Sequence, residues 1–314
     1  MKVLEALRRV AAPVSKKISP PDGGDIFDDE FQRKLEYLAI VSRRVFSGRL
    51  RAERRTKKSG SGVEFADHRD YVAGDDFRYL DWNVYSRMGR LLVRLYEEEE
   101  DLSIYLVVDC SSSMGFGGGK KLLYAKRLAA ALAYIGLSNL DRIAVLGASD
   151  RLRARIPSSR GKARIFTVFS LLRSLQAGGT TDLADALRTF AVQYKRRGLV
   201  VLLTDLYDPH GFEGAINVLR YARFEPFVLH IVDANDAQPS VSGDVRVYDC
   251  ETGDERDVTV TPKLLAQVQK AHQAYLVEIR RFCLERQVNY VAADVSVPFD
   301  ELVLRVLRRG GLFA

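Results

Sequence analysis

Apolar and polar positions follow one another along the chain in blocks that predict strands and helices in regular succession. The apolar run Ile104 to Val108 contains β-branched residues and ends at a polar turn, which is typical of a buried strand. Leu199 to Leu203 is a second run of this kind. Further strands are predicted at residues 91–96, 143–148, 151–156, 226–232 and 288–292. Helices are predicted at residues 120–137, 163–175, 183–194, 212–222, 263–285 and 299–307.

The order of these elements indicates the fold class. Strands that alternate with helices favour an α/β protein with a doubly wound, mostly parallel, Rossmann-like sheet. Only the turn Ser149–Asp150 separates the strands at 143–148 and 151–156, so we expect them to form one antiparallel edge hairpin. Residues 243–260 are rich in Asp, Glu and Gly between short β-type pieces, which predicts a surface hairpin.

The N-terminal part of the chain has a different pattern. The breaker cluster Pro20–Gly24 predicts a boundary after a flexible tail. A helix is predicted from Asp28, with a stop at Gly48 and an exposed basic loop at residues 49–62. We therefore expect a tail at 1–25, a basic helix with a charged and aromatic β subdomain at 26–98, and the α/β domain at 99–314.

The net charge of +7 is concentrated in one segment. Residues 31–58 contain ten Lys or Arg and two Glu, a net of +8, which leaves the rest of the chain near −1. A solvated basic face that packs on the carboxylates of residues 97–101 is the favoured interpretation. Binding of nucleic acid or another anionic surface through residues 33–58 is the alternative function, although no nucleic-acid motif accompanies the charge.

Cysteine usage and hydropathy bear on the compartment. Cys110, Cys250 and Cys283 lack paired spacing, which predicts buried, reduced thiols in a cytosolic protein. The sequence has no run of about 18 apolar residues. Its start lacks the apolar core and cleavage pattern of a signal peptide. We expect a cytoplasmic protein without a membrane span.

The first strand leads into the loop that carries candidate chemistry. Asp109 follows the strand, and Ser111 and Ser113 lie at offsets of two and four. A carboxylate and two hydroxyls are hard oxygen donors, which suit Mg²⁺ or Mn²⁺ rather than zinc. Because ligands of open α/β sheets bind at the carboxyl ends of the strands, this loop is placed where a metal site is expected.

Two later segments strengthen this hypothesis. A second strand ends at Thr204–Asp205, and Gly178-Gly179-Thr180-Thr181 precedes an amphipathic helix. Together, the three segments resemble the metal-ion-dependent adhesion site (MIDAS) of the von Willebrand factor A domain. The resemblance implies one Mg²⁺ or Mn²⁺ ion and these ligands: Asp109, Ser111, Ser113, Thr181 and Asp205. Counting forward from the glycines selects Thr180, whereas counting back from the helix selects Thr181, which we prefer.

A second, narrower resemblance covers nearly the whole chain from about Asp28. The order Glu-Phe-x-x-x-Arg-x-Tyr, Gly-Asp-Asp-x-Arg, Asp-Trp and Asp-x-Ser-x-Ser-Met is similar to the bacterial domain-of-unknown-function family 58. The resemblance continues through Asp249–Gly253 and the last helix. It implies a MoxR-type AAA+ ATPase and its client protein as partners. Many members carry membrane helices, and this chain resembles the soluble ones.

Residues 62–82 alternate carboxylates, arginines and aromatics with unusual density. A solvated loop does not need the aromatics, and a core does not tolerate unpaired charges. We predict a cluster of ion pairs and rings that braces the N-terminal segment on the sheet, with a partner-binding surface as the alternative. Its members are Arg69, Tyr71, Asp75, Asp76, Arg78, Asp81 and Trp82.

Enzymatic interpretations fit the sequence less well. Ser111 stands where the haloacid dehalogenase pattern has a second aspartate, and Lys121 replaces the Ser or Thr of a phosphate-binding loop. His68, His210, His230 and His272 show no catalytic or metal spacing, and no base is nominated for a nucleophilic serine. We therefore expect a non-enzymatic adaptor, in which a bound divalent cation recruits an acidic residue of a partner protein.

Overall fold

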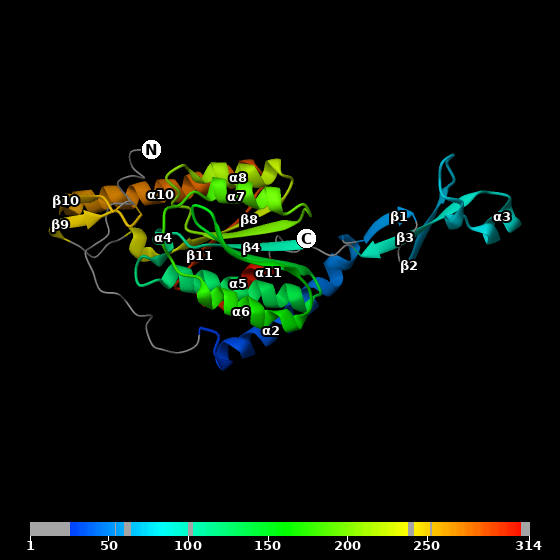
Figure 1. The fold of residues 1–314 in the computed structure, drawn as a ribbon, viewed down its shortest axis with the longest axis horizontal. Helices are drawn as coiled ribbons and strands as arrows, with labels where there is room; N and C mark the ends of the chain where they lie inside the picture. The colour runs from blue at the N-terminus through cyan, green and yellow to red at the C-terminus, as the bar shows by residue number, and fades with distance from the viewer. Residues whose placement is uncertain are drawn as a thin grey trace. The chain divides into compact units, whose positions relative to one another are not determined.

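The computed structural model describes residues 26–53, 55–59, 64–99, 103–237, 242–251 and 253–308 (Figure 1). The predicted tail at residues 1–25 lies outside the described residues. The chain divides into two compact units, with boundaries between Ser42 and Arg43 and between Asp101 and Leu102. Each unit is considered by itself below.

The larger unit is built on a six-stranded sheet with the order β11-β8-β7-β4-β5-β6. All neighbouring strands are parallel except β5 and β6, which pair antiparallel at one edge. The strands are β4 (Ser103–Asp109), β5 (Arg142–Ala148), β6 (Leu152–Ser159), β7 (Leu199–Thr204), β8 (Glu225–Val232) and β11 (Asn289–Asp294). The predicted fold class, an α/β protein with a doubly wound, mostly parallel sheet and one antiparallel edge hairpin, is confirmed.

Helices cover both faces of this sheet (Figure 1). One face carries α7 (Leu183–Gln193), α8 (Phe212–Tyr221) and α10 (Pro262–Glu285). The other carries α5 (Lys120–Ser138), α6 (Ile165–Ser174), α11 (Phe299–Arg308) and the first part of α2 (Asp29–Glu53). The short helices α4 (Ser112–Gly115) and α9 (Ala234–Ala237) follow strands β4 and β8, and a 3-10 turn at Lys162–Arg164 precedes α6. Within the described ranges, no helix has both the length and the apolar character needed to cross a membrane.

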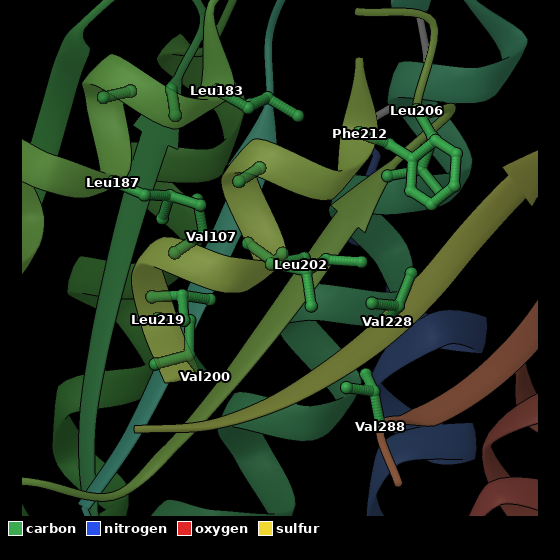
Figure 2. Close-up of a cluster of buried hydrophobic side chains, with 14 of the residues drawn as sticks. Val107, Leu183, Leu187, Val200, Leu202, Leu206, Phe212, Leu219, Val228 and Val288 are labelled. Atoms are coloured by element: carbon green, nitrogen blue, oxygen red, sulfur yellow. The ribbon is translucent and has the colours of Figure 1, made fainter. Parts of the chain in front are cut away.

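The central strands are buried along their whole length. Every residue of β4 and of β7 is buried, as expected for parallel strands that have helices on both sides. Figure 2 shows Val107, Leu202 and Val228 of the sheet packed against Leu187 and Leu219 of the covering helices. This core holds the ends of β4 and β7 in place, and the loops that follow those strands carry the candidate site.

The first part of α2 packs on the larger unit through aromatic rings. Its start is fixed by Asp28, whose carboxylate accepts a hydrogen bond from the Phe31 backbone N–H (2.7 Å). Phe27 stacks on Phe169 of α6, with ring centroids 4.5 Å apart, and Phe31 lies 4.8 Å from Phe299 of α11. The helix predicted from Asp28 is therefore present, and its first turns belong to the core of this unit.

The smaller unit contains the three-stranded antiparallel sheet β1-β3-β2. Its elements are β1 (Arg55–Ser59), β2 (Glu64–Asp70), a 3-10 turn (Phe77–Tyr79), α3 (Trp82–Met88) and β3 (Leu92–Glu99). Two sequence predictions were wrong here. Helix α2 continues through Gly48 to Glu53, because a glycine inside a helix costs only about 1 kcal/mol. The expected basic loop at 49–62 instead contains β1, which gains a ladder of hydrogen bonds with β3.

Candidate functional site

The candidate site lies at the carboxyl ends of two neighbouring parallel strands. Asp109 is the last residue of β4, and Asp205 follows the last residue of β7. Because β4 and β7 pair in parallel, their ends meet at one edge of the sheet. Both carboxylates are buried.

Hydroxyl groups connect the first loop to the second aspartate. Ser111 precedes the first turn of α4, but its hydroxyl makes no helix-capping bond. That hydroxyl lies 2.9 Å from the Ser113 hydroxyl, and Ser113 Oγ donates to Asp205 Oδ1 over 3.1 Å. Three of the five predicted ligands are thus in direct contact with one another, although Ser113 and Asp205 are 92 positions apart.

Asp109 is held at the same place by the backbone and by a neighbouring threonine. Asp109 Oδ1 accepts a hydrogen bond from the Ser111 backbone N–H (2.9 Å), and Thr204 Oγ1 donates to Asp109 Oδ2 (2.6 Å). Burial, followed by the nearby charge of Asp205, raises the pKa of Asp109 to about 7. Two buried carboxylates therefore stand in an environment that favours added positive charge.

The glycine turn brings Thr181 to this edge of the sheet. The Gly179 carbonyl accepts hydrogen bonds from the backbone N–H and the hydroxyl of Ser112 (3.1 and 2.9 Å). Gly179 has a φ of 82°, a conformation that glycine adopts without strain. Thr181 is buried and Thr180 is exposed, so only Thr181 has its side chain directed into the protein. The Thr181 hydroxyl donates to Glu251, which lies between strands β9 (Gly243–Tyr248) and β10 (Glu255–Val260) of an antiparallel hairpin.

A buried lysine also belongs to the site. Lys121 Nζ donates to Asp205 Oδ2 (2.8 Å) and to Asp236 Oδ2 (3.1 Å). Burial acts to lower the pKa of Lys121, but the two carboxylates outweigh it and raise the pKa above its ordinary value. The two oxygens of Asp205 therefore have different partners: Oδ2 accepts from the ammonium group, and Oδ1 accepts from the Ser113 hydroxyl and the Tyr207 backbone N–H.

Four residues at the site were missed from the sequence: Thr204, Lys121, Asp236 and Glu251. The sequence pattern around Lys121 could have indicated its role. Lys121 lies in the first turn of α5, and that turn has no acidic residue. Because a cation is disfavoured beside the positive end of a helix dipole, such a lysine needs a carboxylate partner from elsewhere.

The histidines hold structural positions. His230 is buried, and its two ring nitrogens lie 2.9 Å from Tyr290 Oη and 3.1 Å from the Asp205 carbonyl. Burial lowers the pKa of His230 to about 4. His272 lies beside the Tyr207 hydroxyl, and His68 beside Asp81. In the described part of the chain, no group of three or more His, Cys, Asp or Glu side chains is arranged to hold a metal.

The charged and aromatic cluster of the smaller unit is paired within itself. Arg69 Nη2 lies 2.8 Å from Asp75 Oδ1, and Arg78 Nη2 lies 2.6 Å from Asp76 Oδ2. Asp81 caps α3, because its carboxylate accepts from two backbone N–H groups of the first turn. The Tyr71 ring stacks on Phe77, and Trp82 is largely exposed. The expected ion pairs are present, and the bracing role stays a prediction.

The basic segment includes a strand that runs beside an acidic one. In the register of β1 and β3, Arg55 stands opposite Glu99, and Lys57 stands opposite Glu97. The alternative of anion binding through residues 33–58 stays a prediction.

Sequence comparisons identify relatives across most of the chain. A family model described as "Protein of unknown function DUF58" matches residues 67–275. The chain is 28% identical over 276 residues to the uncharacterized protein Rv1480 of Mycobacterium tuberculosis, an alignment that covers 85% of this chain and 87% of the relative. The uncharacterized protein Mb1516 of Mycobacterium bovis is similar to the same extent.

Structural comparison identifies further similar proteins. The conserved hypothetical protein BatB of Bacteroides thetaiotaomicron is similar with a TM-score of 0.39 and 14% identity, over 68% of this chain and 98% of that one. A von Willebrand factor type A protein of Catenulispora acidiphila is similar with a TM-score of 0.39 and 14% identity, over 82% of this chain and 51% of that one.

Proposed function

The chain belongs to the DUF58 family, and from this premise we propose that it is a non-enzymatic, metal-dependent protein-binding adaptor. Its von Willebrand A-like fold favours a role in protein interaction. In the proposal, Asp109, Ser111, Ser113, Thr181 and Asp205 hold one Mg²⁺ or Mn²⁺ ion. The bound ion supplies a point of attraction for an acidic side chain of a partner protein.

The observation that carries this proposal is the spacing of three oxygens. Ligand oxygens at ~2.0–2.1 Å from Mg²⁺ in an octahedron are about 2.9 Å from their nearest neighbours. The Ser111 and Ser113 hydroxyl oxygens are 2.9 Å apart, and Ser113 Oγ lies 3.1 Å from Asp205 Oδ1. These three groups fit adjacent corners of such an octahedron with little movement.

The remaining groups fit the ion in supporting roles. Both oxygens of Asp109 already accept protein hydrogen bonds, so this carboxylate is suited to hold the ion through water. Mg²⁺ in proteins usually keeps several waters. Lys121 engages Oδ2 of Asp205, whereas Oδ1 accepts from the Ser113 hydroxyl and the Tyr207 backbone N–H and lies on the side of the serine loop. The Thr181 hydroxyl donates its hydrogen to Glu251 and keeps its lone pairs for a cation.

The surroundings of the serines favour binding over turnover. A nucleophilic serine needs a neighbouring base that takes its proton. His230, which contacts the Asp205 carbonyl, also contacts the Tyr290 hydroxyl, and its lowered pKa keeps it neutral. The Ser111 and Ser113 hydroxyls contact each other, and Ser113 also donates to Asp205. We therefore assign no hydrolytic role to this site.

The proposed partners are a MoxR-type AAA+ ATPase and the client protein on which it acts. This partner class comes from the family resemblance of the sequence. An ATPase that remodels other complexes needs a component that recognises its client, and a metal site open to a carboxylate supplies such recognition.

The test is a pull-down of the MoxR-type ATPase of the same organism with the full chain as bait, in Mn²⁺ and in EDTA. Replacing Asp109 by Ala removes a buried carboxylate of the site, and we expect it to abolish Mn²⁺-dependent capture. The matched control is Asp185→Ala, which removes an exposed carboxylate from the first turn of α7 and should capture normally. Equal capture in EDTA, or by Asp109→Ala, would remove the metal from the mechanism.

A further inference from the structure

Thr181 is covered by a carboxylate from a distant part of the chain. Glu251 accepts two hydrogen bonds from this one residue: the Thr181 hydroxyl donates to Oε1 (2.5 Å), and the Thr181 backbone N–H donates to Oε2 (3.2 Å). The two residues are 70 positions apart. Both donors of the predicted threonine ligand are thus used by an acidic side chain, the type of group that the proposed site would recognise on a partner.

Hydrogen bonds at Asp249 hold the backbone beside Glu251. Glu251 follows strand β9 (Gly243–Tyr248), which pairs antiparallel with β10 (Glu255–Val260). The Asp249 side chain accepts a hydrogen bond from the Glu251 backbone N–H (2.8 Å), and the Asp249 backbone N–H donates to the Asp254 carbonyl (2.9 Å). These bonds fix the backbone of the turn, so the Glu251 carboxylate is aimed at Thr181 by the turn itself.

The hairpin is suited to move as a unit. Strands β9 and β10 form a separate two-stranded sheet, beyond one end of the six-stranded sheet (Figure 1). Most of its side chains are exposed or half-buried, with Val247 and Val260 as the buried exceptions. A two-stranded hairpin is marginally stable by itself, and elements with few buried apolar contacts open at low free-energy cost.

We propose that Glu251 is an internal ligand of the candidate site. Its carboxylate occupies the place of a partner's acidic side chain at Thr181, and the β9–β10 hairpin closes the site until a partner carboxylate displaces it. The proposal rests on the proposed function, because it takes an external carboxylate as the competitor. The hairpin then controls the affinity for partners, because only molecules with an open hairpin bind. The apparent dissociation constant equals the intrinsic one divided by the fraction of open molecules.

The first test measures the contact between Glu251 and Thr181 by hydrogen–deuterium exchange of the full chain. Replacing Glu251 by Ala removes the acceptor of the Thr181 N–H, so exchange at Thr181 and along residues 243–251 should rise several-fold. The matched control, Glu255→Ala, removes an exposed carboxylate from the same hairpin and should leave exchange at Thr181 unchanged. Identical exchange at Thr181 in both variants would overturn the proposal. This measurement needs no metal.

The second test measures competition between the Glu251 carboxylate and an external carboxylate. Mn²⁺ is the metal, and propionate serves as a model of a partner's glutamate side chain. Mn²⁺ binding is measured first, and paramagnetic relaxation of the propionate protons then reports their approach to protein-bound Mn²⁺. If the closed state exceeds the open one about ten to one, Glu251→Ala should bind propionate about tenfold more tightly than the natural chain. Glu255→Ala should match the natural chain, and neutral propionamide should show no gain.

The outcomes separate the two proposals. Intact Mn²⁺ binding with equal propionate affinity in all three proteins overturns the internal ligand and leaves the metal site standing. Absence of Mn²⁺ binding to the natural chain overturns the proposed function, and the internal ligand with it.

Discussion

Lys121 places a positive charge beside the candidate metal site, where it neutralises part of the charge of Asp205 and Asp236. The three side chains are almost completely excluded from solvent. A buried ion pair of this kind depends on every partner, because removing one charge leaves the others unpaired and desolvated. The lysine thus fixes the orientation of Asp205, whose other oxygen faces Ser113.

Replacing Lys121 by Met should therefore destabilise the protein by about 3–5 kcal/mol, measured by urea unfolding in EDTA. Added Mn²⁺ should raise the melting temperature of this variant more than that of the natural chain, because the ion supplies the missing charge. Lys120→Met, at the exposed neighbouring position, is the control and should change stability by no more than about 0.5 kcal/mol. A Lys121→Met protein as stable as this control would contradict the assignment.

The proximity of the residues after β4 could be predicted because they follow a strand end in a recognisable order. Asp109, Ser111 and Ser113 are neighbours in sequence, and a single loop brings them together. Glu251 could not be placed in this way. Its contact with Thr181 spans 70 positions and depends on how a surface hairpin folds back, which no local pattern encodes.

At the scale of elements, the glycine turn before α7 is the most demanding part of the site. Gly179 has a φ of 82°, and its carbonyl accepts both hydrogen bonds from Ser112. A side chain at this position would meet backbone strain and the Arg153 guanidinium. The turn therefore couples the position of Thr181 to that of the serine loop.

Gly179→Ala should cost about 1–2 kcal/mol of unfolding free energy and weaken Mn²⁺ binding, because the left-handed conformation is unfavourable for alanine. Gly178→Ala is the matched control, since an added Cβ there meets no atom closer than 3.9 Å and the φ is not positive. Calorimetric Mn²⁺ titration and urea unfolding measure the two effects. Equal behaviour of the two alanine variants would rule out the proposed role of the turn.

The aromatic contact of α2 with α6 and α11 allows a second test at this scale. Phe31 is 3% exposed, and its ring lies between those of Phe27 and Phe299. Phe31→Ala should reduce stability by about 3–5 kcal/mol in thermal or urea unfolding. Phe166, on α6 but 69% exposed, is the control, and its replacement by Ala should cost no more than about 0.5 kcal/mol. A small effect at Phe31 would mean that the start of α2 is not part of the core.

Elements with strong periodicity were predicted well, and the basic N-terminal segment was not. The buried runs at β4 and β7 have one stable arrangement, namely a strand between two helical layers. The segment from Gly48 onward has no such apolar pattern. Its helix end and strand β1 are decided by pairing with β3, a partner about forty positions away in sequence.

For the whole molecule, the distribution of charge distinguishes the two candidate functions. Because no nucleic-acid motif accompanies the charge of residues 33–58, the full chain should bind duplex DNA only weakly at physiological salt, as a nonspecific polycation does. A salt titration of fluorescent DNA, with and without EDTA, measures this. Tight, salt-sensitive DNA binding that is the same with and without EDTA would favour the alternative function, anion binding through residues 33–58.

The central claim is that one divalent cation binds where the loops after β4 and β7 meet. The most direct measurement is an anomalous difference map from crystals of the full chain grown with Mn²⁺. The account predicts a single strong peak in contact with the Ser111 and Ser113 hydroxyls and Asp205 Oδ1, absent from crystals of Asp109→Ala. A map of the natural chain without a peak at these three oxygens would contradict it.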